Sequence, residues 1–235
     1  MASLEGKTAF ITAAGSAVGQ ACAAALAASG ASLCLADHDQ TAIPTSDYPT
    51  RSLKLRLDLH TEASWQDAFR RCQQELGGLD VVVLCNAAGR GGGRIVDTSL
   101  DAFREVLYGT GLVAWIGQKQ AVLAMRKAGQ GGAIVHVSSV LGVIAAPDAA
   151  AFCAAAAGIV MSARAGALEC AKAADGIVIN TVLSAPVSAE DRGCLPDVPP
   201  VEPEDVAAAV VFYATDGAAY MTGTELPVDA GLLCR

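Results

Sequence analysis

Residues 8–19, TAFITAAGSAVG, carry the pattern that decides the fold. The segment opens with a short apolar run of the kind that forms a buried strand, and small residues around Gly15 follow it. From residue 18 the small apolar residues continue in a helical pattern. A buried strand that passes through a glycine-containing loop into a helix is the first unit of a βαβ arrangement. The stretch therefore predicts a parallel sheet with helices packed on it.

The rest of the chain repeats this alternation of apolar runs and helical patterns. Strands are predicted near residues 7–12, 31–36, 52–57, 80–85, 132–138, 176–182 and 225–228. Helices are predicted near residues 18–29, 62–76, 99–108, 111–128, 150–174 and 204–214. The order indicates an α/β fold, a doubly wound Rossmann-like parallel sheet of about seven strands with helices on both faces. Because no repeat, linker or change of composition interrupts it, residues 1–235 are predicted to form a single domain.

Charge and hydrophobicity limit the partners that the chain can have. With 16 basic and 24 acidic residues the formal net charge is -8, which argues against nucleic acid or an anionic membrane as partner. The N-terminus enters the first predicted strand directly, and no apolar run reaches the roughly 18 residues that span a bilayer. We therefore expect a cytoplasmic protein with no membrane partner.

The cysteine content and the apolar content each suggest one further property. The eight cysteines show no metal-ligand spacing and mostly fall in apolar patterns, so we interpret them as reduced core thiols and predict no metal site. An apolar fraction of 53% exceeds what a compact monomer of this size needs. Part of the surface is therefore expected to face a partner chain.

Five motifs fall in register along almost the whole length of the chain. They are the 8–19 loop that ends at Gly19, LADHD ending its strand at Asp37, RLDL with Asp58, VVVLCNAAG with Asn86, and residues 203–231. This set resembles the short-chain dehydrogenase/reductase family. No single motif decides the resemblance, but five in the same order do.

The resemblance also locates four family catalytic positions, which here hold altered residues. In the family a serine, a tyrosine and a lysine share one segment, and the tyrosine exchanges a proton while the lysine lowers its pKa. This sequence has Ser139, Phe152 and Ala156 at those positions, and Thr110 where the family has an asparagine. A phenyl ring and a methyl group cannot exchange a proton, and threonine is not expected to reproduce the helix distortion attributed to the asparagine. Ser139 alone is more simply a turn cap, so we predict no catalytic residue.

The family's cofactor loop is altered as well. Ala13 and Ala17 stand where the family has glycines. The methyl group of Ala17 is expected to intrude on a diphosphate, whereas Ala13 is acceptable if its φ angle is negative. After the sixth strand, where the family has Pro-Gly and a threonine that binds nicotinamide, the chain has Ser184, Ala185 and Ala189.

On the adenosine side of the family site, the residues of this sequence agree better with those of the family. Its remnant comprises Gly15, Gly19, Asp37, Asp58 and Asn86. An acidic residue at position 37 accepts hydrogen bonds from ribose hydroxyls and repels a 2′-phosphate, which favours NAD over NADP. An aspartate at a strand end is also an ordinary turn residue. We expect no cofactor in this chain and NAD in a partner subunit.

Two connections are shorter than in the family. Pro44 and Pro49 limit any helix between the second and third strands to one turn. Between Pro186 and Pro203 the chain is too short and too proline-rich for the helical lid that usually covers the substrate. We therefore predict a single family domain with a shortened lid.

These losses lead to a prediction of a catalytically inactive subunit. We expect it to assemble with an active NAD-dependent short-chain dehydrogenase subunit acting on a hydroxyl or keto substrate, with an acyl-CoA such as hydroxybenzylsuccinyl-CoA as our suggestion. A hetero-oligomer, a tetramer, is expected through helices near residues 111–128 and 150–174, whose small residues permit close packing. Two alternatives remain open: a nucleotide-sensing regulatory module and a residual NAD-dependent oxidoreductase.

Overall fold

A computed structural model describes residues 3–46, 48–85, 93–187, 195 and 200–234. The described residues form one sheet of seven parallel strands in the order β3-β2-β1-β4-β5-β6-β7. The strands are β1 (Thr8–Ile11), β2 (Ser32–Asp37), β3 (Ser52–Arg56), β4 (Val81–Cys85), β5 (Gly132–Ser139), β6 (Ile177–Ser184) and β7 (Glu225–Val228). The predicted α/β fold with seven strands is confirmed, and the strand ends agree with the prediction to within two residues.

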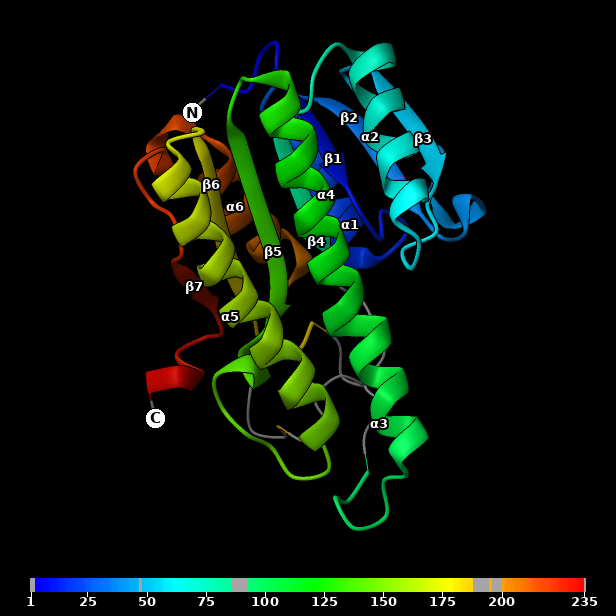
Figure 1. Ribbon diagram of the computed structural model, residues 1–235, viewed down its shortest axis with the longest axis vertical. Coiled ribbons are helices and arrows are strands. Elements are labelled where there is room, and N and C mark those ends of the chain that lie inside the picture. Colours follow the sequence, from blue (N-terminus) through cyan, green and yellow to red (C-terminus); the bar gives the residue numbers. More distant parts are fainter. Residues whose placement is uncertain (1–2, 47, 86–92, 188–194, 196–199, 235) are drawn as a thin grey trace.

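Helices cover both faces of the sheet, as predicted (Figure 1). They are α1 (Ala17–Ala28), α2 (Glu62–Leu76), α3 (Leu100–Val106), α4 (Val113–Ala128), α5 (Ala150–Ala173) and α6 (Pro203–Ala214). In Figure 1, α2, α4 and α5 lie in front of the sheet, and α1 and α6 lie behind it. The chain runs outward from β1 to β3 and then returns to β4. The switch point between β1 and β4 is therefore where a ligand is expected, beyond the carboxyl ends of the strands.

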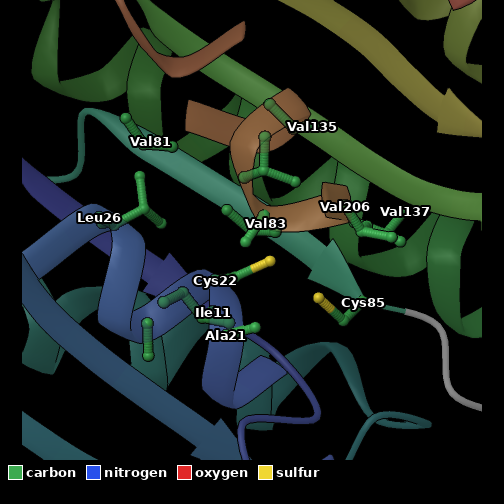
Figure 2. Close-up of a cluster of buried hydrophobic side chains, with 14 of the residues drawn as sticks. Ile11, Ala21, Cys22, Leu26, Val81, Val83, Cys85, Val135, Val137 and Val206 are labelled. Atoms are coloured by element: carbon green, nitrogen blue, oxygen red, sulfur yellow. The ribbon is translucent and has the colours of Figure 1, made fainter. Parts of the chain in front are cut away.

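The core behind the sheet is built from small side chains on α1 and β-branched side chains on the strands. Figure 2 shows Cys22 and Leu26 of α1 facing Val83 and Cys85 of β4. A hydrogen bond with Cys22 and burial raise the pKa of the Cys85 thiol well above its ordinary value. Such a thiol stays protonated at neutral pH, which agrees with the interpretation of core cysteines.

The core in front of the sheet is aromatic. Phe10 of β1 meets Phe69 of α2 edge to face with ring centroids 4.7 Å apart, and Trp65 packs beside both rings. Buried aromatic pairs of this geometry stabilise a protein by about 0.5–1.5 kcal/mol beyond the contribution of the area that they bury. The connection from β2 to β3 passes through one 3₁₀ turn, Gln40–Ala42, as predicted from the prolines.

Helix α5 is unusually apolar for a helix that lies on a surface. By length and composition it is the one described helix that could cross a membrane. The core helix of a soluble protein passes the same test, and α5 buries Ala155, Ile159 and Ala163 against the molecule. Its opposite side exposes Met161 and Leu168. The helix therefore combines a core face with an apolar outer face.

Candidate active site and cofactor cleft

The loop between β1 and α1 keeps a compact conformation although two family glycines are replaced. Thr12 donates its hydroxyl to the carbonyl of Cys85, 3.2 Å away, and this bond ties the end of β1 to the end of β4. Ser16 caps α1 by accepting a hydrogen bond from the amide of Gly19 at 3.0 Å. Ala13 has a φ of 47°, so the condition stated for an alanine at this position, a negative φ, is not met. The left-handed conformation costs a residue with a Cβ atom about 1–2 kcal/mol, and the loop holds Ala13 there nonetheless.

Two glycines of this loop are required by close contacts. A Cβ atom on Gly19 would lie 2.2 Å from the carbonyl oxygen of Ala13, and one on Gly15 would lie 2.8 Å from Ala42. No side chain fits at either position unless the backbone moves. The predicted remnant residues Gly15 and Gly19 therefore determine the shape of the loop.

Asp37 links the end of β2 to this loop. Its side chain is 6% exposed, and Oδ2 accepts a hydrogen bond from the Gly15 amide at 3.0 Å. Asp58 is exposed and accepts a bond from the His60 amide, which is the role of an ordinary turn residue. Asn86 lies outside the described residues. Of the two described polar residues predicted near the adenosine, Asp37 thus lies at the loop and Asp58 serves as a turn residue.

Ser139 is the last residue of β5 and caps the short turn that follows. Its Oγ accepts a hydrogen bond from the amide of Leu141 at 3.2 Å. The hydroxyl proton of a serine that accepts in this way remains able to donate. Ser139 is therefore a turn cap that also keeps one donor at the carboxyl edge of the sheet.

Phe152 and Ala156 lie on the first half of α5, where the family has its tyrosine and lysine. Phe152 is half-buried and packs in a small cluster with Phe103 and Leu107. Ala156 is 1% exposed. Both positions therefore hold carbon side chains that can neither accept nor donate a proton.

The helix that carries Thr110 is distorted at that residue. Residues Leu107–Leu112 form a π-helical turn between α3 and α4. The helix is therefore distorted here although threonine stands in place of the family's asparagine. π turns are rare and are frequent at functional sites. Sequence patterns missed this turn, although the two glycines that flank Thr110 in YGTGL were a local signal.

The segment after β6 is only partly described. The amide of Val201 donates to the carbonyl of Pro186 at 3.0 Å, which brings the two ends of the segment together. Leu195 packs with Ile144 and Leu232. Ser184 donates to the carbonyl of Ala185 at 2.6 Å, while Ala189 and most of the predicted short lid lie outside the described residues.

Comparisons with known proteins agree with this geometry. A family model described as enoyl-(acyl carrier protein) reductase matches residues 12–233. A solved short-chain type dehydrogenase/reductase from Mycobacterium marinum superimposes with a TM-score of 0.92 and 25% identity, covering 99% of this chain and 98% of that one. The chain belongs to the short-chain dehydrogenase/reductase family.

Several members of the short-chain dehydrogenase/reductase family with established names are similar over nearly their full length. A cis-4-hydroxycyclohexanecarboxylate dehydrogenase from Sinomonas cyclohexanicum is 33% identical over 96% of each chain. A meso-2,3-butanediol dehydrogenase from Serratia marcescens is 30% identical, covering 97% of this chain and 94% of its own. The 2,5-dichloro-2,5-cyclohexadiene-1,4-diol dehydrogenase LinX from Sphingobium indicum is 29% identical, with 97% and 96% covered.

These similarities overturn three expectations. Because the named relatives are dehydrogenases, the predictions of an inactive subunit and of a chain that is not an enzyme are wrong. Members of this family bind their dinucleotide within the same chain, so the expectation of no cofactor here is also wrong. The retained loop and Asp37 are therefore more informative about function than the losses at Phe152 and Ala156.

Proposed function

We propose that the chain is an NAD-dependent oxidoreductase that interconverts a secondary alcohol and its ketone. The observation that carries the proposal is the buried Asp37 at the carboxyl end of β2, bonded to Gly15 of the adjacent loop. An acid in this place accepts hydrogen bonds from the ribose hydroxyls of NAD and repels the 2′-phosphate of NADP. The names of the similar dehydrogenases support the reaction class.

The loop fits a dinucleotide diphosphate. Gly15 and Gly19 let the loop pack tightly against Ala42 and Ala13, and the first-turn amides of Ala17 and Val18 have no acceptor within α1. Amides at a helix N-terminus bind anions. The nicotinamide, when bound, accepts or supplies the hydride. Ala17 is exposed, so its methyl group lies at the surface of the loop.

The substrate end favours an apolar carbon skeleton with one hydroxyl or keto group. Phe152, Phe103 and Leu107 form an apolar cluster on the α3 and α5 side, and Ser139 keeps a hydroxyl donor at the strand end. We propose an alicyclic secondary alcohol as substrate, as several of the relatives' names suggest. Ser139 would then donate its hydroxyl proton to the substrate oxygen.

The proton-transfer part of the site is degenerate, and we propose that water takes over its role. Oxidation of an alcohol removes a hydride from carbon and a proton from oxygen. Phe152 and Ala156 cannot accept that proton, so it passes to solvent. Turnover should be slower by about 10²–10⁴ than with a positioned base, and alcohol oxidation should speed up as pH rises.

Binding and turnover with the purified chain test the proposal. Calorimetry should show NAD binding, and Asp37→Ala should weaken it by about 10- to 100-fold because hydrogen bonds to a charged group are lost. Asp39→Asn, which changes an exposed neighbouring carboxylate, is the matched control. The appearance of NADH should be followed with cyclohexanol, 2,3-butanediol and a 3β-hydroxysteroid. Absence of NAD binding at millimolar concentration, or of any turnover across the pH range, contradicts the proposal.

We also propose that the outer face of α4 and α5 binds a second chain of the same fold, as in the hetero-oligomer expected from the sequence. This face exposes four large apolar side chains, Trp115, Leu123, Met161 and Leu168. Large apolar side chains exposed on two packed helices are typical of protein interfaces. Light scattering of the isolated chain and co-purification from its host test the proposal. If the chain forms a stable assembly with copies of itself, and no second family member co-purifies with it, the proposed hetero-oligomer in the cytoplasm is excluded.

A further inference from the structure

The carboxyl ends of β5, β6 and β7 lie side by side at the substrate end of the proposed site. Ser139 is the register partner of Ser184, and Ser184 is the register partner of Val228. Beyond Val228 the chain makes a last 3₁₀ turn, Leu232–Cys234, at this edge of the sheet (Figure 1). This terminal turn therefore follows a strand end that lies two strands away from Ser139.

Asp229 holds the terminal turn in place. It is buried, and its two carboxylate oxygens accept hydrogen bonds from the amides of Gly231 and Leu233, each at 2.9 Å. The amide of Leu232 donates to the Asp229 carbonyl at 3.0 Å. Chain ends are usually poorly ordered unless such contacts tie them down. The position of the terminal turn is thus fixed by one side chain.

The two leucines of the terminal turn pack beside the turn that Ser139 caps. They belong to an apolar cluster with a buried layer, Val140, Val160 and Leu183, and a half-buried layer, Ile144, Leu232 and Leu233. Val140 directly follows Ser139, and the amide of Ile144 donates to the Val140 carbonyl at 3.0 Å. The half-buried layer therefore presents apolar surface next to the hydroxyl of Ser139.

We propose that the terminal turn forms the wall of the site that contacts the carbon skeleton of the substrate, an inference that rests on the proposed function. Leu232 and Leu233 are specificity-determining residues, and Asp229 is a positioning residue. The skeleton of an alcohol that is hydrogen-bonded to Ser139 lies beside the half-buried layer. A ring that covers these side chains removes apolar surface from water, whereas a short polar alcohol removes little. The terminal turn therefore favours alicyclic alcohols.

Steady-state kinetics with NAD and either cyclohexanol or 2,3-butanediol test the inference. The double variant Leu232→Ala with Leu233→Ala should raise KM for cyclohexanol about tenfold, because apolar contact area is lost. Its kcat, and its KM for 2,3-butanediol and for NAD, should change by less than about twofold, because the contact binds substrate and transition state alike. Each single variant should raise KM for cyclohexanol by about threefold, which keeps the test available if the double variant does not fold.

Asp229→Asn tests the positioning role, because it keeps both leucines and replaces one acceptor oxygen by a donor. It should raise KM for cyclohexanol by about threefold and leave kcat unchanged. Leu76→Ala is the matched control. Leu76 is also half-buried, but its carbonyl accepts from Thr8 Oγ1 at the start of β1, so it lies at the opposite edge of the sheet. This variant should lower the melting temperature and keep the wild-type KM values.

Two results would overturn the inference while the proposed function stands. One is wild-type KM for cyclohexanol in the folded leucine variants. The other is a wild-type protein that oxidises 2,3-butanediol but not cyclohexanol. If no NADH appears with either alcohol, the proposed function fails and this inference fails with it.

Discussion

The adenosine end and the catalytic end of the candidate site differ in how their polar side chains are hydrogen-bonded. At the adenosine end, between β1, α1 and β2, the side chains of Thr12, Ser16 and Asp37 all have hydrogen-bond partners in the protein. At the catalytic end, along β5 and the π turn, Thr110 Oγ1, Ser138 Oγ and Nδ1 of His136 are buried without a hydrogen-bond partner among the described residues.

This difference shows at which end of the site the polar side chains already have their hydrogen-bond partners. Buried polar groups are normally paired, and leaving one unpaired costs about 1–3 kcal/mol. At the adenosine end, hydrogen bonds within the protein therefore hold the polar side chains of the binding surface in place. The catalytic end keeps the backbone of an active site, including the π turn, but has carbon side chains where the family exchanges protons.

The largest expected effect tests the catalytic end directly. The double variant Phe152→Tyr with Ala156→Lys restores a proton donor and the group that lowers its pKa. Its turnover number for alcohol oxidation should rise by about 10²–10⁴. The measurement is kcat with NAD and an alicyclic alcohol that the wild-type protein oxidises.

Phe103→Tyr is the control, because it adds the same hydroxyl to the same apolar cluster without restoring the family position. It should not raise kcat as the double variant does, because it does not restore the family position. Since Ala156 is 1% exposed, thermal melting must show that the double variant is folded. If the double variant is folded but its kcat equals that of the wild type, the catalytic end lacks other groups besides the proton donor.

The next effect concerns the buried His136 of the same region. Burial lowers its pKa from 6.5 to about 4, and its Nε2 lies 2.8 Å from Oε1 of Gln118. The unfolded chain takes up a proton near pH 6.5 and the folded chain does not, so stability falls as pH decreases from 6.5 toward 4. The loss amounts to about 3 kcal/mol, and this histidine adds no pH dependence above that window. Urea unfolding across this range measures it.

His136→Asn should flatten that part of the profile, because the amide keeps a donor for Gln118 and does not titrate. The comparison between the two profiles removes the contribution of carboxylates, which both proteins share. If the stability of both proteins falls in parallel as the pH decreases, His136 takes up a proton in the folded protein. The catalytic end is then more hydrated than its burial implies.

The smallest effect tests the adenosine end. Gly19→Ala places a methyl group against the Ala13 carbonyl and should destabilise the protein by about 1–3 kcal/mol and weaken NAD binding. Gly158→Ala is the control, because it lies mid-helix with no atom within 4 Å of the added carbon, and it should stabilise the isolated chain by about 1 kcal/mol. Thermal melts and calorimetry measure both. Equal stability of the two variants would mean that the loop adapts more easily than its contacts suggest.

The elements of the fold were predictable because their signals are local. The run TAFI, the prolines at 44 and 49, and the alanine-rich stretch of α5 each specify a strand, a short connection or a helix within a few residues. The altered catalytic positions were visible too, but the sequence did not show that the loop around Ala13 keeps its shape. That shape depends on Asp37, Ala36 and Cys85, which reach the loop from other strands.

The sequence by itself determined the order of strands and helices and the loss of the tyrosine and lysine, because periodicity and residue identity need no partner. Only the tertiary structure decided that Ala13 takes a left-handed conformation, that Thr110 lies in a π turn and that His38 shares the carboxylate of Asp37. Each of these depends on groups that are distant in the chain or on the geometry of a whole turn. Their balance of strain, hydrogen bonds and burial is set by packing.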